Sequence, residues 1–233
     1  MKTALCFAGT GRSIEYTFEN IKSKLIDPID NCDIYVYIAD NPKAELTKEL
    51  FSDLTSNIDV VQEEDTDPTQ YRFRDMWPPS IPSDLNKGRD IYLKMIRSRK
   101  HLLDMIDDSY DRVVFSRMDV LYQTDISEVI EKLDMSHLWI PNFHNWLGGY
   151  NDRFAISNYE NLKSYLCQWD YMDQYKSENF PFQAETALKR HLDEMGVNPK
   201  FFKYNFIRVR GDGRKHDSTF SAVENVESRP CSI

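Results

Sequence analysis

Residues 3–12 have the sequence TALCFAGTGR, a short apolar run that ends in a Gly-Thr-Gly turn and an arginine. An apolar run of this length before a glycine-rich turn predicts a buried strand entering a tight turn. The apolar positions that follow are spaced by four, three and four residues: Ile14, Phe18, Ile21 and Leu25. That spacing forms one face of a helix, which Pro28 ends. Strand, turn and amphipathic helix together predict the opening unit of a parallel α/β sheet.

The same alternation of apolar strands and amphipathic helices continues through most of the chain. Further strands are predicted at residues 33–39, 58–62, 112–116 and 138–141. Helices are predicted at residues 14–25, 44–54, 90–106, 127–133, 158–166 and 184–195. This order predicts an α/β fold with a mostly parallel sheet flanked by helices, in a single domain. Ligands of such sheets bind at the carboxyl ends of the strands.

A long irregular stretch, residues 63–87, separates the third predicted strand from the helix that follows it. It contains four prolines and several aromatic residues, among them Tyr71, Phe73 and Trp77. Flexible linkers are rich in Gly and Ser, whereas long loops inside compact domains are usually functional. We therefore expect this stretch to act as a lid over a binding site.

Composition limits the classes of function. The 233 residues carry 29 Lys and Arg against 38 Asp and Glu, a net charge of −9. A protein that binds nucleic acid nonspecifically normally carries the opposite sign, so no nucleic-acid partner is expected. An anionic ligand remains possible if the basic residues gather in one place.

The sequence also bears on the compartment. The N-terminal apolar run is too short for a signal peptide, and no 18-residue apolar stretch could span a membrane. The four cysteines lack the C-x-x-C spacing of zinc or thioredoxin-type sites, and reduced thiols are the simplest interpretation. We expect a soluble, cytoplasmic protein without a transmembrane segment.

The turn Gly9–Arg12 lies where a phosphate group could bind. Backbone N–H groups at a helix N-terminus attract phosphate, and Arg12 could add a bidentate contact. A dinucleotide-binding fingerprint would need a glycine at the position of Ile14, and no Walker A sequence is present. A purely structural tight turn is the alternative.

Arg117-Met118-Asp119 comes directly after the strand predicted at residues 112–116. A charged pair at the end of a central strand is costly unless it meets water, a partner or a ligand. Asp119 could hold a divalent cation that bridges a diphosphate, while Arg117 neutralises the phosphates; a simple ion pair is the alternative. Asp65 and Asp67 also have the spacing of metal ligands, but they belong to an acidic run typical of a solvated loop.

The second half of the chain carries three more candidates. Residues 146–154, WLGGYNDRF, combine aromatic faces that pack on sugars with Asn and Asp groups that bind hydroxyls. Glu185 begins the last helix, where it could act as a general base with a raised pKa or simply favour the helix dipole. His216 and Asp217 could form a metal-ligand pair, a phosphate clamp or part of a mobile tail.

Four segments together resemble one known family. They are CFAGTGRSIEYTFENIKSKLIDPIDNCDIYVYIAD (residues 6–40), YDRVVFSRMDVLY (110–122), NDRFAISNYENLKSY (151–165) and AETALKRHL (184–192). In this order, over about residues 2–210, the chain resembles nucleotide-sugar-dependent glycosyltransferases of the GT-A fold. Such enzymes occur in bacteria and in large DNA viruses, including viruses that glycosylate their own capsid protein.

The resemblance implies a Rossmann-like GT-A domain that binds a nucleoside-diphosphate sugar, usually with Mn²⁺ or Mg²⁺. The implied nucleotide-sugar site contains Ala8, Gly9, Gly11, Arg12, Arg97, Arg117, Met118, Trp146, Gly148 and Gly149. Asp119 matches the last acidic residue of the family's metal-binding D-x-D, His216 would complete the metal site, and Asp152 and Glu185 would be catalytic. Arg117 replaces the first Asp of D-x-D, so whether the enzyme needs a metal stays open.

We therefore expect a glycosyltransferase that moves a hexosyl, deoxyhexosyl or pentosyl group from a UDP-sugar to a glycan or glycoprotein acceptor. Residues 1–125 would form the nucleotide-binding half, and residues 126–233 the acceptor and sugar half with a C-terminal tail. Glu185 or Asp152 would deprotonate the acceptor in an inverting reaction, and neither need do so in a retaining one. The resemblance further implies a bacterial or viral protein, in the host cytoplasm if viral, and we expect a monomer or weak dimer.

Two alternatives remain. One is a nucleotide-binding hydrolase or nucleotidyltransferase on a similar sheet. The other is a sugar-binding module without enzymatic activity, which would stack sugars on Trp77, Trp146 and Tyr150.

Overall fold

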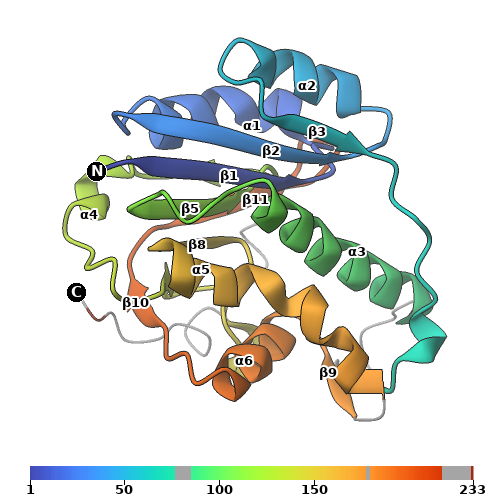
Figure 1. Cartoon of the computed structure of the whole chain (residues 1–233). Helices are drawn as coiled ribbons and strands as arrows, with labels where there is room; N and C mark the ends of the chain where they lie inside the picture. The colour runs from blue at the N-terminus through green and yellow to red at the C-terminus, as the bar shows by residue number, and fades with distance from the viewer. Residues whose placement is uncertain (77–84, 177–178, 217–231, 233) are drawn as a thin grey trace.

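A seven-stranded sheet forms the centre of the computed structural model, which describes the backbone of residues 1–76, 85–176, 179–216 and 232 (Figure 1). Its strand order is β10-β7-β8-β5-β1-β2-β3. The strands are Thr3–Gly9 (β1), Cys32–Ala39 (β2), Ile58–Val61 (β3), Arg112–Arg117 (β5), Trp139–Pro141 (β7), Phe154–Ser157 (β8) and Lys200–Phe202 (β10). All neighbours pair in parallel except β8, which is antiparallel to β5 and β7. The predicted α/β class and mostly parallel sheet are confirmed.

Helices cover both faces of this sheet (Figure 1). One face carries α1 (Ile14–Ile21), which continues as the π-helix η1 (Lys22–Ile26), together with α2 (Ala44–Ser52) and α4 (Ser127–Ile130). The other face carries α3 (Leu85–Asp104), α5 (Tyr159–Leu166) and α6 (Ala184–Glu194). Alternate side chains of a strand point to opposite faces, so Leu5 and Phe7 pack in the first cluster and Ala4, Cys6 and Ala8 in the second.

Two small sheets accompany the central one. β6 (Val120–Tyr122), β11 (Phe206–Val209) and β12 (Lys215–His216) pair antiparallel, and β4 (Phe73–Asp75) pairs parallel with β9 (Phe180–Phe182). Short helical turns are η2 (Pro68–Gln70), η3 (Trp146–Gly148) and η4 (Cys167–Lys176). Because β6 comes soon after β5, its pairing with β11 returns the chain to the carboxyl end of β5.

The local elements expected from the sequence are present. The five predicted strands correspond to β1, β2, β3, β5 and β7, and the six predicted helices to α1 with η1 and α2 to α6. The central strand β8 was not predicted. It has only four residues and is buried on both faces, so it shows no alternation of apolar and polar side chains.

The long loop is more structured than expected. Residues 85–87 already belong to α3, and β4 anchors the middle of the loop because Phe73 lies 5.7 Å from Phe182 and 6.1 Å from Tyr92, centroid to centroid. The expected lid is therefore fixed to the domain at residues 73–75. Trp77 and the rest of residues 77–84 lie outside the described residues, and for them the lid stays a prediction.

In the part of the chain that the structure describes, no helix combines the length and apolar character needed to cross a bilayer. Three of the four cysteines, Cys6, Cys32 and Cys167, are free thiols, as expected. Cys231 lies outside the described residues.

Candidate functional site

A cavity of about 300 Å³ opens at the carboxyl ends of β1 and β5. Its lining comes from the turn after β1, one side of α3, the β5–β6 turn, and the end of β11. Among the described residues that line it, six are basic and two acidic: Arg12, Lys94, Arg99, Arg117, Arg208 and Arg210 against Glu63 and Asp119. In a chain of net charge −9, this local excess of cations favours an anionic ligand.

The turn after β1 is built by two glycines in unusual backbone conformations. Gly9 has φ 148° and Gly11 has φ 59°, values that residues with a side chain rarely adopt. A Cβ at Gly11 would also overlap Oγ1 of Thr47 on α2. The Ile14 N–H donates to Gly11 O at 2.9 Å as α1 begins. Backbone conformation and packing therefore require glycine at position 11, and the same turn lines the cavity.

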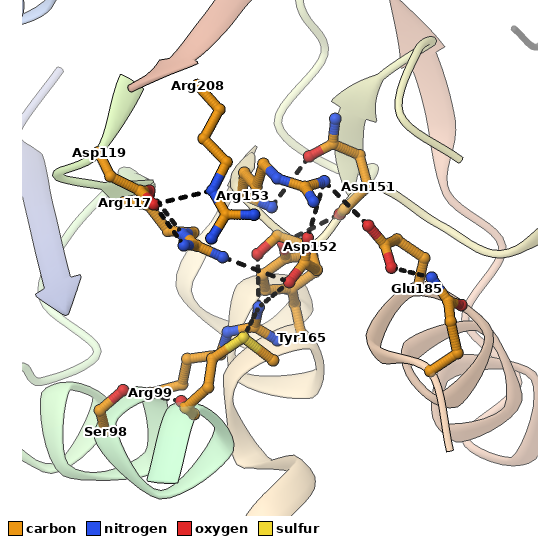
Figure 2. Close-up of polar contacts among 12 residues, drawn as sticks. Ser98, Arg99, Arg117, Asp119, Asn151, Asp152, Arg153, Tyr165, Glu185 and Arg208 are labelled. Carbon is orange, nitrogen blue, oxygen red and sulfur yellow. Dashed lines mark hydrogen bonds and ion pairs between the residues drawn. The ribbon is translucent and has the colours of Figure 1, made fainter. Parts of the chain in front are cut away.

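Asp119 is surrounded by three guanidinium groups at the cavity. Arg117 Nε donates to Asp119 Oδ1 at 2.8 Å and Arg117 Nη2 to Oδ2 at 2.6 Å, a bidentate pair. Oδ2 also accepts from Arg208 Nε at 3.1 Å and from Arg12 Nη2 at 3.3 Å. Figure 2 shows the contacts of Arg117 and Arg208. These cations hold the pKa of Asp119 well below its usual range despite its burial, which acts in the opposite direction.

Backbone contacts fix Asp119 between the first and last parts of the chain. The Thr17 hydroxyl donates to Met118 O at 2.7 Å, which ties the β5–β6 turn to α1. The Val209 N–H donates to Asp119 O at 2.8 Å, which places β11 beside the same turn. Arg208 therefore reaches the cavity from 89 residues further along the chain.

Burial and neighbouring positive charges lower the pKa values of two arginines at the cavity, Arg208 and Arg210. Burial, and after it the positive charge of Arg117, lower the pKa of Arg208 to about 9. Burial and then Arg12 lower the pKa of Arg210. Both guanidiniums are thus held among other cations, and a bound anion would relieve this repulsion.

Asp152 is a buried carboxylate that does not line the cavity and that contacts three arginines. Its carboxylate is 3.4 Å from Arg99 Nη2, 3.0 Å from Arg153 Nη1 and 3.8 Å from Arg117 Nη1. Arg99 also donates to the backbone carbonyl of Asp152. Asp152 is 1% exposed, and the positive charges around it lower its pKa to about 2 although burial opposes this. Its ionised form is needed to balance the arginines.

Glu185 ends this buried network at the start of α6. It accepts from Arg153 Nη1 at 2.9 Å and from the side chain of Gln183. Burial, and after it the charge of Asp152, raise the pKa of Glu185 to about 7. Figure 2 shows the resulting series of ion pairs, from Asp119 through Arg117, Asp152 and Arg153 to Glu185.

One protein-family model covers most of the chain. A family model described as Domain of unknown function (DUF7796) matches residues 1–217 of the chain. The chain belongs to this family. No curated protein matches the sequence of this DUF7796 chain.

Among solved structures, the DUF7796 chain is similar to several glycosyltransferases. With GlyE of Streptococcus pneumoniae TIGR4 it shares 15% identity at a TM-score of 0.45, over 84% of this chain and 43% of GlyE. With mouse xyloside xylosyltransferase 1 it shares 12% identity at a TM-score of 0.43, over 86% of this chain and 84% of the mouse chain. With the galactosyltransferase LgtC it shares 16% identity at a TM-score of 0.48, over 85% of this chain and 73% of the LgtC chain. Similarity at this level does not assign an activity to the DUF7796 chain.

Seven of the candidates from the sequence line the cavity: Ala8, Gly9, Gly11, Arg12, Arg117, Met118 and Asp119. Arg97, expected to face a diphosphate, does not line it. Its helix position directs it to Glu64 at 2.7 Å and over the Trp169 ring. The next residues of the same helix, Ser98 and Arg99, lie on the cavity side.

The remaining candidates lie elsewhere in the DUF7796 chain. Asp152, Glu185, Trp146, Gly148 and Gly149 are not among the described lining residues. Gly149 is required by close packing, because a Cβ there would overlap the backbone of Glu185. Tyr150, one of the expected sugar-stacking residues, is 5% exposed and so offers no free face. The side chain of His216, and Asp217 altogether, lie outside the described residues.

Sequence reasoning missed Arg208 and Arg210 as cavity residues, and it did not assign a role to Arg99 or Arg153. The sequence gives little signal for these two residues, because Arg208 lies on the four-residue strand β11 and Arg210 follows its end. It gives none for Arg99 and Arg153. Which side of α3 meets the cavity, and which neighbour Arg153 pairs with, depend on tertiary packing.

The described residues do not fit a divalent cation. Mg²⁺ and Mn²⁺ prefer carboxylate oxygens and water, whereas both oxygens of Asp119 already accept from arginines. In the described ranges no three His, Cys, Asp or Glu side chains gather as metal ligands. The rival pair does not converge either: Asp67 caps the Thr69 N–H at 2.9 Å, and Asp65 pairs with Lys94 at 3.4 Å.

Proposed function

We propose that this chain is a GT-A-type glycosyltransferase that transfers a sugar from a nucleoside-diphosphate sugar to a glycan or glycoprotein acceptor. One observation carries the proposal: a cavity at the carboxyl ends of parallel strands, where six basic and two acidic side chains of the described residues form part of the lining. Ligands of parallel α/β sheets bind at this edge, and an excess of cations there selects an anion. A diphosphate is an anion of the required charge and position.

The cavity also suits the uncharged parts of such a donor. Ile91 and Met95 of α3 line it together with Phe115 and Met118 of β5 and its turn. Ligand sites commonly combine apolar walls with a few polar groups that fix orientation. The apolar walls would contact the base and sugar rings, while Arg12, Arg117 and Arg208 would contact the phosphates.

In the proposed reaction, the bond between the sugar's anomeric carbon and the diphosphate oxygen breaks, and its electron pair stays on the diphosphate. The acceptor oxygen forms the new bond, and its proton passes to the departing diphosphate oxygen. Negative charge therefore grows on the leaving group, where preorganised cations stabilise the transition state most. The proposal assigns this stabilisation to the arginines that line the cavity.

The two carboxylates implied as catalytic have a different role in this proposal. Neither Asp152 nor Glu185 lines the cavity, and both are buried against Arg153. The proposal assigns them to positioning the arginines, with Asp152 holding Arg117 from the side away from Asp119 (Figure 2). A retaining reaction, in which no protein carboxylate needs to deprotonate the acceptor, agrees with this placement.

The resemblance of the sequence supports the finer parts of the proposal. These are UDP as the nucleotide, a hexosyl, deoxyhexosyl or pentosyl group as the sugar, and a bacterial or viral enzyme that acts in the cytoplasm. Within this proposal, the nucleotide site formed by residues 1–125 also takes Arg208 and Arg210 from the second half of the chain.

Product analysis tests the proposal. The chain is incubated with UDP- and GDP-sugars and with glycan acceptors, and the nucleotides are separated by chromatography. We expect release of nucleoside diphosphate with wild type, at least about tenfold slower with Arg208→Gln. Release of monophosphate or pyrophosphate would instead assign a hydrolase or nucleotidyltransferase. Binding of free glycan without any nucleotide would assign a sugar-binding module.

A further inference from the structure

Asp119 and the arginines around it carry an inference that rests on the proposed function. An ionised carboxylate offers about four sites for hydrogen-bond donors. The Asp119 carboxylate accepts four hydrogen bonds from arginines: two from Arg117, one from Arg208 and one from Arg12. A divalent cation could reach these oxygens only by displacing guanidinium groups from them.

The arginines themselves are placed to contact a ligand. The Asp119 side chain is 9% exposed, whereas those of Arg12 and Arg208 are 42% and 22% exposed. The carboxylate is therefore more buried than these two guanidiniums, and Arg12, Arg117 and Arg208 all line the cavity. Each guanidinium has five donors in a planar fork, which matches the oxygens of a phosphate.

Arg117 is also held on its other side. Its Nη1 lies 3.8 Å from Asp152, and Asp152 is in turn paired with Arg99 and Arg153. The position of Arg117 is thus set by two buried carboxylates before any ligand arrives. Preorganisation of this kind strengthens binding, because little side-chain freedom is lost when the ligand binds.

We propose that Arg12, Arg117 and Arg208 take the place of a divalent cation in binding the donor diphosphate, with Asp119 as the residue that positions them. The diphosphate of a nucleotide sugar is a dianion, and the cationic lining of the cavity suffices to neutralise it. Binding of the nucleoside diphosphate therefore needs no metal.

Calorimetric titration tests this directly. The full chain is titrated with UDP, GDP, ADP and CDP, in EDTA and then in MnCl₂ or MgCl₂. We expect the tightest-binding nucleotide to show dissociation constants within about threefold of each other in the two buffers. A larger gain on adding metal, or binding seen only with metal, would overturn the inference and leave the proposed function intact. No binding of any of the four nucleotides in either buffer would overturn both.

A pair of variants tests the arginines themselves. Arg208→Gln removes one guanidinium from the cavity, and we expect it to weaken binding at least about tenfold in EDTA. Arg214→Gln is the matched control, because Arg214 is 81% exposed, pairs with Asp212 and does not line the cavity. Equal affinity of Arg208→Gln and Arg214→Gln, with native circular dichroism for both, would overturn the inference.

Discussion

Arg153 and Glu185 form a buried ion pair, with Arg153 Nη1 2.9 Å from Glu185 Oε1 (Figure 2). The pair lies at the start of α6, at the end of the series of charges that begins at Asp119. Burial raises the pKa of Glu185 from 4.5 to about 7, while the neighbouring arginine opposes the shift. The raised pKa makes the stability of this region depend on pH near neutrality.

Glu185→Gln should flatten that dependence. Between pH 4.5 and 7 the native state keeps a proton on Glu185 that the unfolded state has lost. The stabilisation is therefore present below pH 4.5 and is lost as pH rises through about 7. Urea unfolding from pH 5 to 7 should show a wild-type slope steeper than that of Glu185→Gln by up to about 1.4 kcal/mol per pH unit. Glu160→Gln, at an exposed position on α5, should keep the wild-type slope; identical slopes for all three proteins would contradict the assignment.

Gly11→Ala should destabilise the chain by about 2–4 kcal/mol. The substitution combines a positive φ of 59° with overlap between the new Cβ and Thr47 Oγ1. Gly196→Ala is the matched control, because Gly196 has φ 71° with no atom near the added Cβ, and it should cost only about 1 kcal/mol. Thermal or urea unfolding measures both. If Gly196→Ala proves as costly as Gly11→Ala, contact with Thr47 does not explain the glycine.

Asp152→Asn should be among the most destabilising single changes. The carboxylate balances Arg99, Arg117 and Arg153 at a site that is 1% exposed. Removing one partner of a buried ion pair typically costs about 3–5 kcal/mol. Asp212→Asn, which alters an exposed pair with Arg214, should stay within about 0.5 kcal/mol of wild type. A loss below about 1 kcal/mol for Asp152→Asn, by urea unfolding at pH 7, would show that the arginines do not depend on it.

Arg97→Gln should leave nucleoside diphosphate affinity within about twofold of wild type. Arg97 pairs with exposed Glu64 and does not line the cavity, although the resemblance implied a phosphate contact there. Arg12→Gln should weaken binding at least about fivefold, since Arg12 lines the cavity beside Asp119. Calorimetry on both variants decides the matter. An equal loss in the two would mean that the ligand extends past α3 to Arg97.

The parts of the fold that could be predicted share one property: their signals are local. The strand at β1 and the helix face of Ile14, Phe18 and Ile21 follow from spacing within a few residues. The starting point of α3 was placed five residues too late, at Asp90 instead of Leu85. The short strands β6, β8 and β11 were missed, since whether so short a segment joins a sheet depends on its partner strands elsewhere in the chain.

The residues of the candidate site also fall into those with a local signal in the sequence and those without one. Gly9, Gly11, Arg12 and Asp119 were found because the carboxyl ends of parallel strands are where ligands meet a sheet. The sequence could not show that Arg99 lines the cavity and Arg97 does not. The side of α3 that faces the cavity is set by packing against the sheet.

From the sequence alone, the alternation of strands and helices determined the α/β class and the edge of the sheet that carries the cavity, because backbone periodicity and turn chemistry act over a few residues. The Arg117–Asp119 pair was one of the alternatives that the sequence offered, but the other partners of these two residues were decided only by tertiary structure. Pairing of β6 with β11 brings Arg208 to Asp119, and packing of α3 and α6 brings Arg99 and Glu185 to the arginine network. The physical reason is the range of the interaction: a guanidinium stabilises a carboxylate across a few ångströms of space, regardless of how many residues separate them in the chain.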